Sequence, residues 1–174
     1  DVPVEAAGWM VSMLPFATVV FAPVFGILVD KVGHGTRWML AGAVLALIAH
    51  LMLAFAPSGV PFYGYISMVF LGFGYSLVPA AMWPSVPRIV PEKVLGTAYS
   101  LIYWVQNLGL MSFKMLAGKI LADTNLDNGV SETGAVRVEV MFVAVCVMAL
   151  LLAVSLRVYS RRNPHLKIDL PDQS

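Results

Sequence analysis

Five long apolar stretches, separated by short polar links, follow one another along this chain of 174 residues. They cover residues 8–29, 38–56, 62–84, 96–118 and 138–158. A helix needs about 20 apolar residues, each rising about 1.5 Å, to cross the roughly 30 Å hydrocarbon core of a bilayer. A helix also satisfies its own backbone hydrogen bonds in lipid, which an open strand cannot do. The pattern therefore predicts an all-α, multi-pass membrane protein with five transmembrane helices.

The links between the stretches carry residues typical of turns. Residues 30–35 and 56–59 are glycine-containing turns, and residues 87–93 hold two prolines and three charged side chains. Residues 123–137 read as a longer polar loop. The tail from Arg161 is polar and interrupted by proline, so we expect it to be flexible.

Composition supports the membrane assignment. Hydrophobic residues make up 59% of the chain and charged residues only 12%, and the mean hydropathy is +0.82. A soluble domain of this size could not bury so much apolar surface in its own core. The single cysteine, Cys146, lies in an apolar stretch, so we expect a packing role for it, no disulfide, and no metal or cofactor. Because the chain begins at Asp1 without a signal-peptide pattern, we expect sequence upstream of it.

The distribution of basic residues predicts the orientation. With five spans, the first link, the third link and the tail lie on one side of the membrane. That side holds Lys31, Arg37, Arg88, Lys93, Arg157, Arg161, Arg162 and Lys167. The loops of the other side hold only Lys119 and Arg137, beside acidic residues. The positive-inside rule therefore predicts a cytoplasmic tail at 161–174 and an N-terminal end outside.

The first link carries a sequence signature. Residues 26–37 read G-I-L-V-D-K-V-G-H-G-T-R, which resembles the cytoplasmic loop signature of the major facilitator superfamily. The matching residues are Gly26, Leu28, Asp30, Lys31 and Gly33, whereas His34 and Gly35 stand where basic residues are usual. The plainer explanation is that any short cytoplasmic loop contains glycine and basic residues.

The resemblance implies a role for each matching residue. Gly26 would permit close helix approach, and Gly33 would permit a tight turn. Asp30 would face the positive end of a neighbouring helix, while Lys31 and Arg37 would hold the loop in the cytoplasm. The five helices would then be helices eight to twelve of a twelve-helix transporter, an incomplete C-terminal half that partners a missing N-terminal half.

A second block, from Trp83 to Gly109, carries a narrower resemblance. It combines W-P at 83–84, V-P-E at 90–92, L-G-T-A-Y at 95–99 and Q-N-L-G at 106–109. This combination is similar to the major facilitator superfamily domain-containing protein 1 subfamily, whose animal members are lysosomal dipeptide transporters. The resemblance implies an alternating-access carrier of dipeptides or similar small solutes. It also implies a lysosomal membrane in an animal or the inner membrane in a bacterium, and an accessory membrane subunit as a possible partner.

Polar side chains concentrate in the third and fourth stretches, where they are costly unless they face protein or water. The substrate-cavity candidates are Ser76, Trp83, Tyr99, Tyr103, Gln106, Asn107 and Lys114. Tyr103, Asn107 and Lys114 recur at helical spacing and share one face of a helix. Their amide and hydroxyl groups suit a peptide backbone, and Lys114 suits a carboxylate. The alternatives are that they bridge helices, or that Lys114 extends to the lipid headgroups.

Two interpretations remain open for each of three other features. Gly72, Gly74 and Pro79 form either a bendable middle of the third helix or a packing surface. Trp83 is either an interfacial anchor or part of an inner gate. His50, near the outer end of the second stretch, is either a pH sensor or a packed neutral histidine.

No pattern of catalytic, nucleotide-binding or nucleic-acid-binding residues occurs, so we expect a protein that is not an enzyme. We also expect no aspartate or glutamate at membrane depth. Proton coupling would then depend on the missing half, or transport would be passive, as in a uniporter. The competing functions are an organic-anion or sugar carrier of the same superfamily, and a membrane scaffold that binds a partner without transport.

Overall fold

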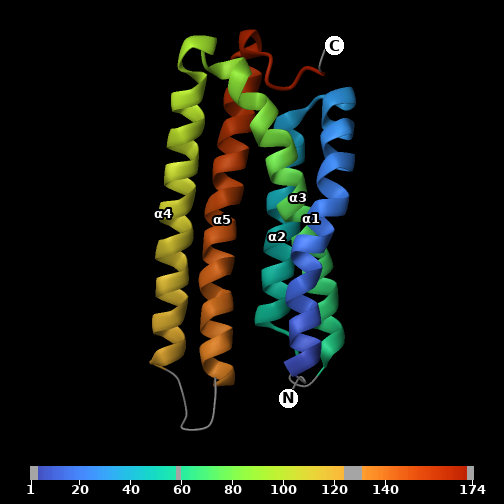
Figure 1. Ribbon diagram of the computed structural model, residues 1–174, viewed down its shortest axis with the longest axis vertical. Helices are drawn as coiled ribbons and strands as arrows, with labels where there is room; N and C mark the ends of the chain where they lie inside the picture. Colours follow the sequence, from blue (N-terminus) through green and yellow to red (C-terminus); the bar gives the residue numbers. More distant parts are fainter. Residues whose placement is uncertain (1–3, 58–59, 124–130, 172–174) are drawn as a thin grey trace.

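The computed structural model describes residues 4–57, 60–123 and 131–171, and these residues contain long helices and no strand. The helices are α1 (Val4–Val32), α2 (Gly35–Ala54), α3 (Pro61–Ile89), α4 (Leu95–Ala122) and α5 (Glu132–Arg162). Two short 3-10 turns, η1 (Glu92–Val94) and η2 (Pro164–Leu166), precede α4 and follow α5. The long helices run up and down, roughly parallel to one another (Figure 1). The predicted all-α fold is confirmed.

The helix ends differ from the predicted boundaries. The predicted polar loop at 123–137 is wrong from Glu132 onward, because α5 begins there. The Ser131 hydroxyl accepts a hydrogen bond from the Gly134 N–H at 3.0 Å and caps the helix. Similarly, α3 continues through Pro87 to Ile89, so the third link is shorter than predicted. Residues 58–59 and 124–130 of the predicted links lie outside the described residues.

Helix α2 lies in the middle of the bundle. It packs against α3 on one side and α5 on the other, and α1 packs against α3. A Cβ atom at Gly74 would lie 2.8 Å from the Gly42 carbonyl oxygen, and one at Gly72 would lie 2.7 Å from the Ala17 Cβ. These contacts leave no room for larger residues, so the small residues of α3 serve helix packing.

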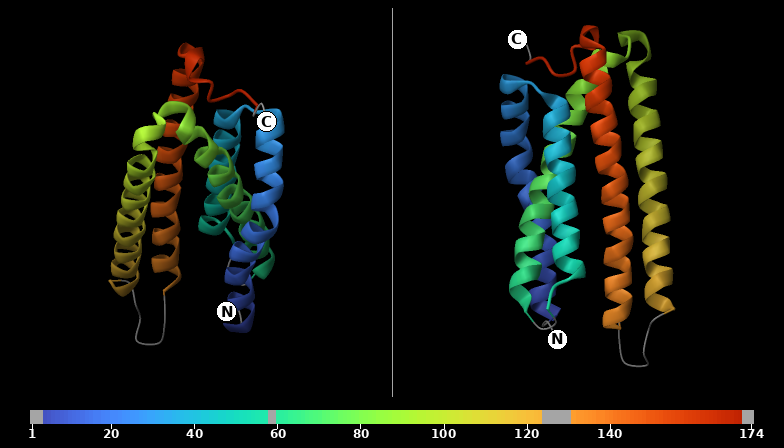
Figure 2. Two further views of the ribbon diagram at one scale, coloured as in Figure 1. Left: turned by 45° about the horizontal axis from the view of Figure 1, so that its top comes forward. Right: turned by 180° about the vertical axis from the view of Figure 1, so that it is seen from behind.

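Helix α4 is placed differently from the other helices. It stands at the edge of the bundle beside α5, and both remain side by side when the molecule is turned (Figure 2). None of its residues is buried. Most of its surface is therefore open to lipid, to water or to protein that lies beyond residues 4–171.

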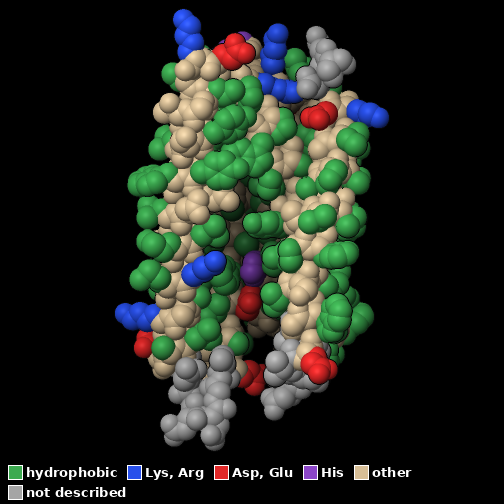
Figure 3. Space-filling view, in the orientation of Figure 1, with side chains coloured by type: hydrophobic (Ala, Val, Ile, Leu, Met, Phe, Trp, Pro, Cys, Tyr) green, Lys and Arg blue, Asp and Glu red, His purple; other side chains and the backbone are tan. Residues whose placement is uncertain are grey.

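The surface has the character of a membrane protein. Apolar side chains cover the flanks of the face seen in Figure 3, and most charged side chains gather toward its two ends. Four helices of the described residues, α1, α2, α3 and α5, are long and apolar enough to cross a membrane. Helix α4 has 28 residues but is not among them. Gln106, Asn107 and Lys114 interrupt its apolar run.

The two ends of the bundle differ in what they carry. The α1–α2 link, the α3–α4 link and the C-terminal tail share one end, which is at the top of Figure 1. The start of α1 lies at the opposite end. The expectation of a flexible tail is wrong for residues 163–171, because they fold back over the bundle and hydrogen-bond to α2 and α3.

Candidate functional site

Three aromatic side chains join α3 to α4. The Trp83 and Tyr103 rings stack with centroids 4.8 Å apart, and Tyr99 lies against the same indole at 5.6 Å. The Tyr99 hydroxyl donates a hydrogen bond to the Trp83 carbonyl at 3.3 Å. Trp83 is thus held against α4 by both tyrosines, although contacts between the two helices are otherwise sparse. The Tyr103 side chain stays 53% exposed.

Polar groups continue along this side of α4. Asn107 donates from its amide nitrogen to the Tyr103 carbonyl at 2.8 Å, so its side-chain oxygen is left to accept from another group. Gln106 and Lys114 are exposed, and neither side chain makes a hydrogen bond within the described part of the chain. We call Tyr99, Tyr103, Gln106, Asn107 and Lys114 the α4 face. It offers amide, hydroxyl and ammonium groups beside an aromatic platform.

Ser76 does not join the α4 face. Its side chain is 1% exposed, and its hydroxyl donates to the Gly72 carbonyl at 2.7 Å within α3. Of the seven cavity candidates, the structure therefore brings Trp83, Tyr99 and Tyr103 into contact. It places Gln106, Asn107 and Lys114 further along the same side of α4, and it leaves Ser76 inside the α3 packing surface.

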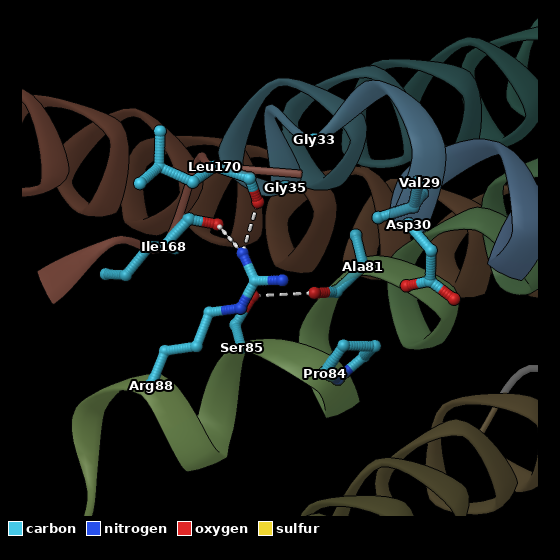
Figure 4. A pocket seen from close by; sticks show the side chains of 10 residues that line it. All are labelled: Val29, Asp30, Gly33, Gly35, Ala81, Pro84, Ser85, Arg88, Ile168 and Leu170. Atoms are coloured by element: carbon cyan, nitrogen blue, oxygen red, sulfur yellow. Dashed lines mark hydrogen bonds between the residues drawn. The ribbon is translucent and has the colours of Figure 1, made fainter. Parts of the chain in front are cut away.

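The loop signature adopts the predicted tight turn. Gly33 has a φ of +69°, a conformation that a residue with a side chain rarely adopts. Lys31 and Arg37 are exposed beside it. The predicted close approach at Gly26 is wrong among the described residues, because a Cβ atom there would meet nothing within 4 Å. The Asp30 side chain makes no hydrogen bond or ion pair with a described residue, and its carboxylate points away from Arg88 (Figure 4).

The tail packs against the two positions at which the signature departs from its usual form. The His34 N–H donates to the Asp169 carbonyl at 2.8 Å, and His34 has a φ of 61°. A Cβ atom at Gly35 would lie 3.3 Å from both the Ile168 carbonyl oxygen and the Ser85 hydroxyl. A side chain at position 35 would therefore require Ile168 or Ser85 to shift by a few tenths of an ångström.

A cluster of hydrogen bonds, which we call the tail clasp, fixes the tail to three helices. Its residues are Thr36, Arg88, Ser160 and Asp169. One Asp169 carboxylate oxygen accepts from the Thr36 backbone N–H at 2.9 Å and from its hydroxyl at 2.8 Å. The other accepts from the Ser160 hydroxyl at 2.8 Å. A carboxylate at the first turn of α2 also complements the positive end of that helix.

Arg88 completes the clasp from α3. One guanidinium nitrogen donates to the carbonyls of Lys167, Ile168 and Leu170. Figure 4 shows the bonds to Ile168 and Leu170. Burial disfavours the ionised form of Asp169, but the hydrogen bonds from Thr36 and Ser160 outweigh it and lower the pKa of the carboxyl below its ordinary value. The carboxylate is therefore charged at neutral pH.

A second hollow lies elsewhere. It is an open groove between α1 and α3, lined by Trp9, Phe16, Val20, Met68 and other mostly apolar residues. Ser12 is among them, but its hydroxyl donates to the Gly8 carbonyl at 2.8 Å. The groove thus lacks groups that would bind a polar solute, and the α4 face remains the better candidate.

Comparison with known proteins agrees with the helical arrangement and the loop signature. The sequence profile described as Major Facilitator Superfamily matches residues 1–173, nearly the whole chain. The chain belongs to this superfamily. It is a multi-pass membrane protein, and the resemblance read from residues 26–37 is confirmed.

Curated relatives support the narrower resemblance that was read from residues 83–109. Proteins named lysosomal dipeptide transporter MFSD1 are 38% identical in mouse over 158 residues and 37% identical in human over 157 residues. Each match covers 90% of this chain and 31% of the relative. The chicken protein of that name is 45% identical over 134 residues, which is 76% of this chain and 27% of the relative. The chain therefore spans about a third of the length of these superfamily members.

Sequence reasoning missed two groups of residues in this superfamily member. The tail clasp joins Thr36 to Asp169 across 133 positions, and no local pattern reveals such a pairing. The expectation of no acidic residue at membrane depth is also wrong. Glu139 lies within α5 and inside the predicted span 138–158, where it bonds to His50. A single carboxylate in an apolar run was the signal that could have identified it.

Proposed function

We propose that the full-length protein is a secondary transporter that carries dipeptides or similar small polar solutes by alternating access. The observation that carries this proposal is the α4 face, with exposed amide, hydroxyl and ammonium groups on a helix of a membrane bundle. Polar groups in such a position are costly unless they meet water, solute or another protein segment. The similarity to proteins named lysosomal dipeptide transporter supports the choice of solute.

The groups of the α4 face suit the parts of a dipeptide. The free side-chain oxygen of Asn107 can accept from a peptide or amino N–H, and Gln106 offers both a donor and an acceptor. The Tyr103 ring can cover an apolar or cationic side chain. Lys114 can attract the terminal carboxylate. We place the tail end of the bundle in the cytoplasm, because its basic residues would be costly to move across the bilayer.

Counterflow in proteoliposomes that contain the full-length protein tests this function. We expect a labelled dipeptide to exchange, and unlabelled dipeptides to compete while sugars do not. Competition by sugars but not by peptides would reject the peptide assignment. If no solute exchanges while a partner protein still binds, the scaffold hypothesis replaces transport.

An organic-anion carrier is the second candidate, because Lys114 is an exposed ammonium group on a membrane helix. In that case anions without a peptide bond would compete as well as dipeptides do. Lys114→Ala would then weaken their competition about fivefold, because it removes one favourable charge contact of about 1 kcal/mol. Unchanged competition by anions in the Lys114→Ala variant would remove this candidate.

A further inference from the structure

His50 of α2 and Glu139 of α5 meet inside the bundle. The imidazole Nδ1 lies 2.8 Å from the carboxylate Oε2, and the two side chains are only 14% and 23% exposed. His50 lies four residues before the end of α2, and Glu139 lies seven residues after the start of α5. Both helices are apolar enough to cross a membrane, so the pair lies within membrane-spanning segments on the side opposite the tail.

The imidazole is held in place by its surroundings. The Phe142 ring, almost one turn beyond Glu139 on α5, stacks on it with centroids 5.1 Å apart and an interplanar angle of 20°. The neighbouring residue Ala49 is completely buried. Aromatic stacking and the hydrogen bond therefore fix the ring so that Nδ1 faces the carboxylate.

Few other ionisable groups lie in the halves of these helices opposite the tail. On α5 they are the exposed Glu132 and Arg137, and Cys146, whose thiol lies within electrostatic reach of the Glu139 carboxylate. Helix α4 contributes the exposed Lys114 and Lys119, and α3 contributes Tyr63, Tyr65 and Tyr75. Among the described residues, none of these groups forms an ion pair or hydrogen bond with His50 or Glu139.

The cost of burying charge sets the preferred proton content of the pair. With one proton, the pair is neutral overall, as imidazolium with carboxylate or as imidazole with carboxylic acid. With no proton it carries one negative charge, and with two it carries one positive charge. Either net charge is unfavourable in a membrane interior. Proton binding and release by the pair must therefore change the strength of the α2–α5 contact.

We propose that His50 and Glu139 form a proton-binding site that makes transport by the full-length protein depend on pH. With one proton bound, the pair is neutral and joins α2 to α5. A second proton, arriving from the side opposite the tail, forms an O–H bond on Glu139. An imidazolium then faces a neutral carboxyl, and the attraction between the helices weakens. The inference rests on the proposed transport function, and it adds a bound proton that regulates the transport of the solute.

Dipeptide counterflow at several values between about pH 5 and 8 tests the site. For the unmodified full-length protein, we expect the exchange rate to change about fivefold or more across this range, the low end of a typical coupling between two sites. In Glu139→Gln and in His50→Gln the change should fall to less than twofold. Glu132→Gln, which removes an exposed carboxylate of the same helix, should keep the unmodified pH profile.

Exchanging the two residues controls for misfolding. The double variant His50→Glu with Glu139→His rebuilds the pair in reverse and should recover the pH dependence that either single variant loses. Superimposable pH profiles of the unmodified protein and Glu139→Gln would overturn the proposal.

Infrared difference spectra test the same site without transport. Acidifying the purified full-length protein should produce a carboxylic-acid band that Glu139→Gln lacks and Glu132→Gln keeps. If no variant exchanges dipeptide at any pH, the proposed function fails, while the infrared band still decides whether the pair binds a proton. An unchanged band in Glu139→Gln would reject the proton site even in a protein that transports.

Discussion

The tail clasp and the α4 face use similar polar groups in opposite ways. In the clasp, the Asp169 carboxylate, the Thr36 and Ser160 hydroxyls and the Arg88 guanidinium all have partners within the chain. On the α4 face, Gln106 and Lys114 have none among the described residues, and Tyr103 is half exposed. Satisfied polar groups hold a structure together, whereas unsatisfied ones on a membrane helix indicate a surface that meets another molecule or segment.

The packing of the glycines shows the same contrast. A Cβ atom at Gly74 would collide with the backbone of α2, whereas one at Gly109 or Gly118 of α4 would meet nothing within 4 Å. The α2–α3 contact is therefore tightly packed, whereas most of the α4 surface has no packing partner among the described residues. Four predictions test this comparison, given in decreasing order of their expected size.

Replacing Gly74 by alanine should cause the largest loss of stability. The added methyl group would lie 2.8 Å from the Gly42 carbonyl oxygen, so α2 and α3 must separate, at a cost of about 3 kcal/mol. The thermal unfolding of the full-length protein in detergent measures this cost. Gly118→Ala, in the open surface of α4, serves as the control and should be neutral or stabilise by about 0.5–1 kcal/mol. Equal losses in both variants would mean that α4 is packed as tightly as α3.

Asp169→Asn should destabilise the tail by about 2 kcal/mol, because the new amide group places a donor against the donors of Thr36 or Ser160. Hydrogen–deuterium exchange of residues 163–171 should become faster while the centres of the helices stay protected. Asp123→Asn, at the exposed end of α4, provides the matched control and should change neither measurement. A tail that stays protected in Asp169→Asn would show that Arg88 alone holds it.

Tyr103→Ala should weaken dipeptide binding about fivefold, which corresponds to the loss of about 1 kcal/mol from one aromatic contact. Because the Tyr103 side chain is half exposed, thermal stability should hardly change. Concentration-dependent counterflow and thermal unfolding together separate these effects. Tyr75→Ala removes a similarly exposed tyrosine from α3 as the control. A stability loss without any change in binding would assign Tyr103 to helix packing instead.

Acidification below about pH 4 should have the smallest of the four effects, and it should act on the tail clasp. Because the pKa of Asp169 is lowered in the folded protein, its contribution to stability is complete above the ordinary aspartate value of about 3.9. That contribution is lost as the pH falls through the lowered value. Proteolysis of the tail should therefore accelerate only below about pH 4, and Asp169→Asn should remove this dependence. Acceleration near pH 6 would instead point to a histidine.

Some of the candidate site could be read from the sequence because it depends on neighbours along one helix. Tyr103, Asn107 and Lys114 share a face through the helical repeat alone, so their alignment followed from spacing. Ser76 has the same polar character but turns into the α3 packing surface, and only the neighbouring helices determine that. Positions 34 and 35, where the loop signature departs from its usual form, likewise lie against the tail, more than 130 positions away.

The apolar helices of membrane-spanning length could be predicted without a structure, and local motifs identified the superfamily. Hydrophobicity and helical periodicity act over a few turns, so a linear sequence reveals them. The contacts between polar groups, in contrast, became visible only in three dimensions. The Asp169 clasp and the His50–Glu139 pair each join residues far apart in sequence, and their partners follow from how the helices pack and where the tail returns.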